Sequence, residues 1–138
     1  MHRFVGTWSL VRWSSGEAQP FGPEPRGTLV YTAEGAMISA FMRRGRAPLA
    51  ASLQELSAWR WRSSPSPDID RRFIEAALGF NSYAGRYSIE GKRVHHDVEV
   101  ALFPDWVGQR MTRNFRFEGD ALALGFGNDL LVWRRGEA

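Results

Sequence analysis

One histidine and one arginine have the types and positions that could support chemistry. Residues 93–102 alternate strictly, with valines and His96 on one face and His95 with the acidic residues on the other. The apolar face of such a strand turns toward the protein interior, so we expect His96 inside and His95 in water. The same alternation in residues 109–118 predicts that Arg113 points inward. His96 as an acid or base and Arg113 as an anion partner would suit a cofactor-independent isomerase, cyclase or dehydratase that acts on a polyketide-like small molecule.

Metal chemistry is not expected from this sequence. His95 and His96 are neighbours on one strand and point apart, so they cannot bind the same ion. The chain has one further histidine, His2, and no cysteine. We therefore predict no metal site and no cofactor.

Other strands are expected to add aromatic residues to the interior. Alternation over residues 4–14 places Trp8 and Leu10 on one face, with Arg12 following on that face, and residues 82–90 contribute two tyrosines. An apolar wall with a few polar groups is typical of a small-molecule site. The predicted ligand-binding residues are Trp8, Arg12, Tyr83, Tyr87, Met111, Phe115 and Phe117.

Each of these residues also has a purely structural interpretation. His96 would then be a hydrogen-bonded core histidine, and the tyrosines would be packing residues with satisfied hydroxyls. Arg113 or Arg12 could stack on Trp8 and close one end of a barrel. A bulge near Pro104 could shift the register and invert some faces.

The elements that position these residues are short strands joined by tight turns. Glycines at 35, 91 and 119 mark the turns of three hairpins. An antiparallel meander of eight strands closes most simply into an up-and-down barrel, because closure removes the sheet edges. We therefore predict an all-β fold with one domain over residues 1–138 and strands at residues 4–14, 27–32, 36–43, 82–90, 93–102, 109–118, 121–126 and 130–135.

A helical insertion is expected between the third and fourth strands. Ser52 begins a capping-box pattern that predicts a short helix up to Trp59. Residues 68–80 repeat apolar side chains at helical spacing, which predicts an amphipathic helix. The helix is expected to cap a barrel end and bury Phe73, Ile74 and Ala77, to form a lid over a pocket, or to do both.

Composition excludes several classes of function. The net charge is +3 with a single lysine, and the arginines are scattered along the chain, so we do not expect nucleic-acid binding. No stretch approaches the ~18 apolar residues of a membrane span, and the start lacks the apolar run of a signal peptide. We therefore predict a soluble cytoplasmic protein without a membrane partner. Exposed apolar residues on outward strand faces could support a homodimer.

Several short motifs resemble one family. They include Gly6-Thr7-Trp8, Tyr83-Ala84-Gly85-Arg86-Tyr87, Phe103-Pro104-Asp105-Trp106 and Leu131-Val132-Trp133. Together with residues 20–22, 27–32 and 94–96, they are similar to the lipocalin-like domain family of small bacterial and fungal proteins. The similarity runs from about residue 4 to 134 and is weakest over residues 44–72. It implies a lipocalin-like barrel, but it implies no particular reaction.

The functional hypothesis is therefore a barrel that binds a small hydrophobic or aromatic molecule in its interior. The isomerase or cyclase remains the alternative. A polar group with a perturbed pKa beside a cavity would favour the enzyme, and a wholly apolar closed cavity would favour the binding protein.

Overall fold

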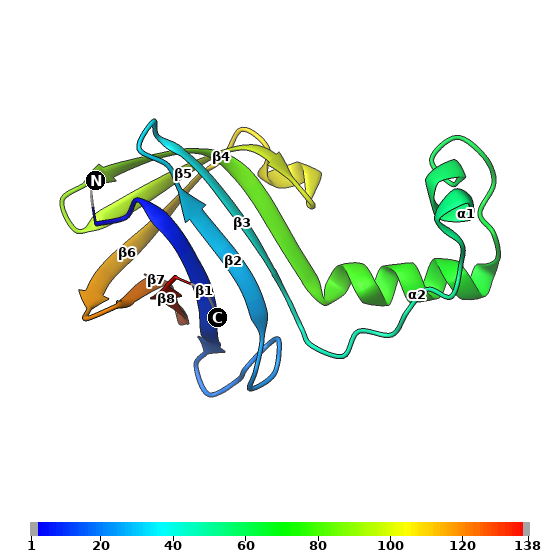
Figure 1. Cartoon of the computed structure of the whole chain (residues 1–138), viewed down its shortest axis with the longest axis horizontal. Helices are drawn as coiled ribbons and strands as arrows, with labels where there is room; N and C mark the ends of the chain where they lie inside the picture. Colours follow the sequence, from blue (N-terminus) through cyan, green and yellow to red (C-terminus); the bar gives the residue numbers. More distant parts are fainter. Residues whose placement is uncertain (1–2, 137–138) are drawn as a thin grey trace.

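Alternating strands and tight turns close into a barrel in the computed structural model, which describes residues 3–136 (Figure 1). Each strand pairs antiparallel with the next, and the eighth pairs back with the first. The predicted eight-stranded up-and-down barrel is thus confirmed. The strands are β1 (Gly6–Ser15), β2 (Arg26–Tyr31), β3 (Ala36–Met42), β4 (Phe80–Glu90), β5 (Arg93–Ala101), β6 (Arg110–Glu118), β7 (Ala121–Phe126) and β8 (Asp129–Arg135), with a 3-10 helix η1 (Pro104–Trp106) after β5.

A β-bulge in β1 changes which side chains reach the interior. The register of β1 against β8 shifts between Leu10 and Arg12, so the extra residue reverses the alternation beyond that point. Arg12 is exposed, and Trp13 turns inward to pack against Phe21. The prediction that Arg12 faces the interior is therefore wrong, because strict alternation does not anticipate a bulge at this position.

One end of the barrel is filled by aromatic side chains. Phe4, just before β1, is 2% exposed and meets the rings of Phe115 and Phe117 edge-to-face at 4.8 and 5.0 Å. Trp8 is 1% exposed and donates its indole N–H to the carbonyl of Phe4 at 2.9 Å. Arg135 covers this end with its guanidinium 4.1 Å from the Trp8 ring. An arginine does stack on Trp8, but it is Arg135 rather than the predicted Arg113 or Arg12.

The insertion between β3 and β4 forms two helices, α1 (Leu53–Ala58) and α2 (Pro67–Leu78), as predicted. Ser52 caps α1 through a capping box, and Ser66 caps α2 with Pro67 in the first turn. These helices project away from the barrel (Figure 1). We call residues 44–79 the arm.

The arm does not cap the barrel end. Phe73 and Ile74 are 49% and 58% exposed, and α2 buries no residue fully. A single residue, Gly79, separates α2 from β4, which leaves no linker to fold the helix back. The predicted burial of Phe73, Ile74 and Ala77 against the barrel is therefore wrong. Trp59 covers Phe73 instead, with ring centroids 5.0 Å apart.

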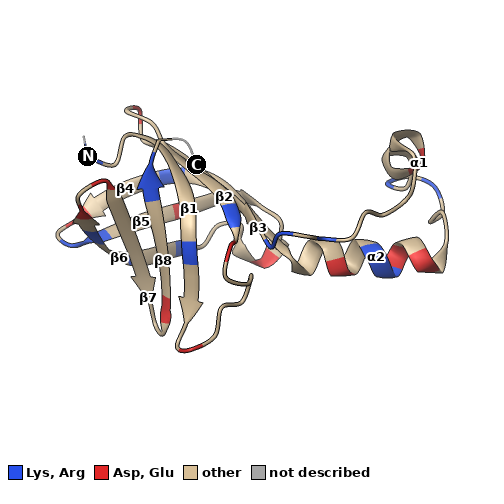
Figure 2. Cartoon of the chain, turned by 60° about the horizontal axis from the view of Figure 1, so that its bottom comes forward, with Lys and Arg blue, Asp and Glu red and all other residues tan. Residues whose placement is uncertain are grey.

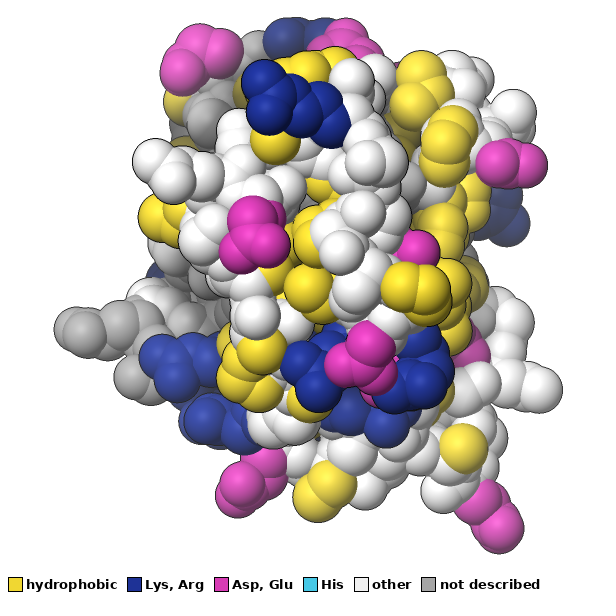
Figure 3. Space-filling model, turned by 90° about the vertical axis from the view of Figure 1, so that its right-hand side faces the viewer, with side chains coloured by type: hydrophobic (Ala, Val, Ile, Leu, Met, Phe, Trp, Pro, Cys, Tyr) yellow, Lys and Arg dark blue, Asp and Glu magenta, His cyan; other side chains and the backbone are white. Residues whose placement is uncertain are grey.

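The surface carries charges of both signs and some apolar side chains. Figure 2 shows that basic and acidic residues are interspersed over the barrel and the arm. From the side of the arm, hydrophobic side chains reach the surface above a band of basic ones (Figure 3). Within residues 3–136, no helix has the length and apolar character needed to cross a membrane.

Candidate functional site

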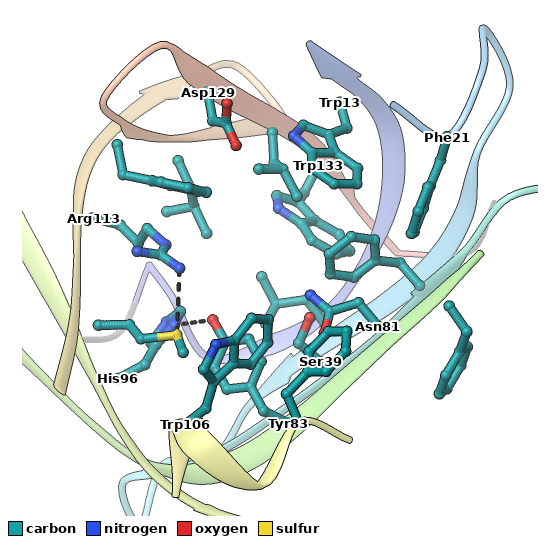
Figure 4. A pocket seen from close by; sticks show the side chains of 18 of the residues that line it. Trp13, Phe21, Ser39, Asn81, Tyr83, His96, Trp106, Arg113, Asp129 and Trp133 are labelled. Carbon is teal, nitrogen blue, oxygen red and sulfur yellow. Dashed lines mark hydrogen bonds between the residues drawn. The ribbon is translucent and has the colours of Figure 1, made fainter. Parts of the chain in front are cut away.

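The barrel encloses a cavity of about 490 Å³ on the side away from Phe4 and Trp8 (Figure 4). Leu78 and Phe103 belong to its lining and are 66% and 38% exposed, so they mark its opening. Within residues 3–136, the barrel is therefore packed at one end and open at the other. Most of the wall is apolar, and nearly half of its residues are aromatic: Trp13, Phe21, Phe41, Phe80, Tyr83, Phe103, Trp106, Phe126 and Trp133.

A few polar groups interrupt this apolar wall. His96, Tyr83 and Arg113 lie together on one side (Figure 4). Asn81 and Ser39 adjoin Tyr83, because Asn81 precedes it by two residues on β4 and Ser39 is its partner on β3. The carbonyl oxygen of the Asn81 side chain is buried without a hydrogen-bond partner among the described residues. The same holds for the indole nitrogens of Trp13 and Trp133. Asp129 provides a carboxylate to the lining.

His96 is held by two tyrosine hydroxyls. Its Nε2 lies 2.6 Å from the hydroxyl of Tyr31, and its Nδ1 lies 2.7 Å from that of Tyr83. The side chain is 1% exposed, which confirms that His96 points inward. Burial, followed by the nearby charge of Arg113, lowers the pKa of His96 to about 3. The imidazole is therefore neutral at physiological pH.

This pKa predicts a specific loss of stability on acidification. Between pH 6.5 and about 3, the unfolded chain carries a proton on His96 that the folded barrel does not accept. The free energy of unfolding should therefore fall as the pH falls below 6.5, by at most about 1.4 kcal/mol per pH unit from this group. Urea unfolding between pH 7.5 and 5 measures the effect. Hydrogen bonds to Arg110 and His95 lower the pKa of the Asp97 and Glu90 carboxyls respectively, which adds a loss of stability of the same sign on acidification. The His96→Gln variant separates that loss from the contribution of His96.

The control for this titration is His96→Gln, which keeps a polar side chain but cannot take up a proton. The variant should be less stable at pH 7.5, and its stability should change less between pH 7.5 and 5. Equal pH dependence in both proteins would contradict the assignment to His96.

Arg113 brings a positive charge to the cavity wall. Its guanidinium lies 3.7 Å from the ring centre of Phe126. This cation–π contact stabilises the positive charge of the guanidinium. Its hydrogen bonds are long, at 3.4 Å to the carbonyl of Thr112 and 3.5 Å to the sulfur of Met111. No carboxylate among residues 3–136 forms an ion pair with it. Burial raises the pKa of the Tyr83 hydroxyl, and the charge of Arg113 opposes that effect.

The predicted site residues lie in three different places. Tyr83, His96, Met111 and Arg113 line the cavity. Phe115, Phe117 and Trp8 belong to the packed end. Tyr87 meets the ring of Tyr31 edge-on and donates its hydroxyl to the carbonyl of Thr32. Arg12 lies on the outer face. Alternation identified inward faces but not the level along the barrel at which each side chain lies.

His95 points outward as predicted, but it does not lie in water. It is 7% exposed, with Nδ1 2.8 Å from the Thr112 hydroxyl and Nε2 3.0 Å from Glu90. It therefore bridges the outer face of neighbouring strands. Among residues 3–136, no group of three or more histidine or acidic side chains could hold a metal ion.

Several lining residues were missed at the sequence level. Trp13 was missed because of the bulge, and Phe21 because it lies in a loop without periodicity. Trp133 and Leu131 alternate within β8, so the pattern itself could have identified them. Trp106 belongs to a motif that carried the family resemblance but gave no indication of its position.

Comparison with known proteins places the chain in a family. The family model of the lipocalin-like domain matches residues 5–135, so the chain belongs to this family. It is similar to a lipocalin-like protein from Bacteroides uniformis, with a TM-score of 0.54, 10% identity and coverage of 97% of this chain and 99% of that one. An uncharacterized protein from Bacteroides eggerthii is similar as well, with a TM-score of 0.55, 10% identity and coverage of 96% and 99%. These structures agree with the fold.

A curated relative is the 4'-hydroxy-3'-methoxypropiophenone carrier protein ppsC of Aspergillus oryzae. The match is 27% identical over 71 residues, which cover 46% of this chain. It spans 64% of that relative, less than two thirds of its length.

Proposed function

We propose that this protein binds a small, largely apolar aromatic molecule in the barrel cavity and acts as its carrier. The observation that carries the proposal is the cavity of about 490 Å³ with a mostly apolar wall rich in aromatic side chains. Small-molecule sites commonly have volumes of about 300–1,000 Å³, apolar walls and a few polar groups that set orientation. The name of the Aspergillus relative adds support, because it describes a carrier of an aromatic ketone.

Native mass spectrometry of the protein purified from its own host tests the proposal directly. A stoichiometric small molecule, released on denaturation, is the expected result. Titration of the empty protein with aromatic compounds, followed by calorimetry, then gives affinities. Failure to retain or bind any aromatic compound of suitable size would overturn the proposal.

Filling the cavity should abolish binding without unfolding the barrel. Ser39 lies on β3, is 3% exposed and belongs to the cavity lining, so Ser39→Phe adds a ring inside the cavity. We expect ligand affinity to fall by about tenfold or more, because the ring occupies volume that the ligand needs. Calorimetry measures the affinity, and thermal unfolding shows whether the fold persists.

The matched control is Ile38→Phe at the preceding position. Ile38 is 49% exposed, so its side chain points away from the cavity and the added ring stays outside. Its affinity should equal that of the unmodified protein. Equal affinities in all three proteins would place the ligand outside the cavity.

A cofactor-independent isomerase or cyclase in the same cavity is the second candidate. The perturbed pKa of His96 beside the cavity favours it. However, the lowered pKa makes His96 a weak base, and both ring nitrogens already have hydrogen-bond partners. We therefore rank the carrier first. Recovery of a bound ligand chemically unchanged after long incubation supports the carrier, and recovery of an isomer supports the enzyme.

A further inference from the structure

The hydrogen bonds of His96 determine which group can offer a proton to the cavity. A neutral imidazole has one N–H donor and one acceptor nitrogen. Its two partners are the hydroxyls of Tyr31 at Nε2 and Tyr83 at Nδ1. One tyrosine must therefore donate to His96, and the other must accept from it.

Burial decides between the two arrangements. Tyr31 is 1% exposed, and among residues 3–136 its hydroxyl has no hydrogen-bond partner other than His96. If it accepted from Nε2, its own proton would be buried without an acceptor, which is costly. Tyr31 therefore donates to Nε2, and Nδ1 donates to the oxygen of Tyr83. The O–H of Tyr83 is left to point at the cavity that this residue lines.

The group beside Tyr83 is also a donor. Arg113 lines the same wall and carries a positive charge with no ion-pair partner among the described residues. A hydroxyl and a guanidinium that converge on one corner of an apolar cavity favour a negatively charged oxygen. Asp129 is the carboxylate of the lining, and it lies across the cavity from His96 (Figure 4).

We propose, building on the proposed binding function, that Arg113 and Tyr83 bind an oxyanion carried by the aromatic ligand. The oxyanion is a phenolate or a carboxylate, since both present the same acceptor to these donors. Tyr31 and His96 act as positioning residues, because their hydrogen bonds fix the direction of the Tyr83 hydroxyl. Neither has a free N–H or O–H left to donate to the ligand. The aromatic remainder of the ligand then packs on the wall formed by Trp106, Phe126 and Trp133.

Three naphthalene probes of similar size test this inference. They are 2-naphthol, naphthalene-2-carboxylate and 2-methoxynaphthalene, the last of which cannot ionise. Calorimetry gives the affinities, and absorption beyond the protein bands follows ionisation of bound 2-naphthol. We expect one or both of the acidic probes to bind at least about tenfold more tightly than 2-methoxynaphthalene. A phenolate site should lower the pKa of bound 2-naphthol by about one unit or more.

Variants connect the preference to the named residues. Arg113→Met removes the charge and should reduce the affinity for the preferred acidic probe by about tenfold, with less than about threefold change for 2-methoxynaphthalene. Tyr83→Phe should act in the same direction with a smaller loss. Asp129→Asn should leave that affinity equal or increase it. Arg12→Met, on the outer face, is the matched control and should change nothing.

The outcomes separate this inference from the function on which it rests. Tighter binding of naphthalene-2-carboxylate than of 2-methoxynaphthalene, with bound 2-naphthol remaining neutral, supports the inference for a carboxylate ligand. A lowered pKa of bound 2-naphthol supports it for a phenolate ligand. Equal affinity for all three probes with an unchanged naphthol pKa overturns it and leaves the binding function intact. No binding of any probe overturns both.

Discussion

Replacing Trp8 by alanine is expected to lower the free energy of unfolding by about 3–5 kcal/mol, the range for a large buried aromatic residue. Trp8 is 1% exposed, hydrogen-bonds to the carbonyl of Phe4 and supports the guanidinium of Arg135. Alanine would leave a void at the packed end. It would also remove the indole N–H that donates to the carbonyl of Phe4. Urea unfolding at neutral pH measures the change.

Trp61→Ala is the control for the loss of a tryptophan. Its side chain is 68% exposed on the arm, so we expect a change within about 0.5 kcal/mol. If both variants lost the same stability, the packed end would not contribute in the way described. Ligand affinity of folded Trp8→Ala should stay within a few fold, because Trp8 lies outside the cavity lining.

Replacing Gly85 by alanine is expected to have the second large effect. Gly85 lies at the bulge between β4 and β5, where an added Cβ would overlap the backbone carbonyl oxygen of Asp97. A backbone atom cannot rotate away as a side chain can, so the paired strands must separate locally. We expect a loss of about 3 kcal/mol, at the upper end of ordinary overpacking. Thermal and urea unfolding both report this loss.

Gly125→Ala is the matched control, since Gly125 also lies within a strand. Its added Cβ would meet the nearest atoms at 3.6 and 3.7 Å, an ordinary contact distance. Its stability should therefore change little, or rise slightly because alanine restricts the unfolded chain. Equal stability of the two variants would contradict the close approach of β4 and β5 at Gly85.

The fold was predictable because period-2 alternation and turn glycines are local signals. His96, Met111 and Arg113 were placed correctly inside because β5 and β6 are regular over these positions. Arg12 was placed wrongly because a one-residue bulge reverses every later side chain of β1. Bulges depend on the pairing partner, here β8, which is remote in sequence.

Which end of the barrel stays hollow was not predictable from the strands alone. Phe4 precedes β1, yet it fills the interior beside Phe115 and Phe117. At the open end of the barrel, Phe21 belongs to the cavity wall although it lies in the loop between β1 and β2. Residues outside regular strands therefore decide the depth of the cavity. The direction in which the arm leaves the barrel could not be predicted from the sequence either. It depends on α2 ending one residue before β4 begins.

The packed end has a kinetic consequence for a barrel that carries cargo. Since the described part of the barrel opens at one end only, a ligand bound as proposed would enter and leave by the same route. An incoming molecule cannot push the resident one out from behind, so exchange must wait for spontaneous departure. The exchange rate should then be independent of the concentration of the competitor. The residence time of the cargo is a property of the barrel itself.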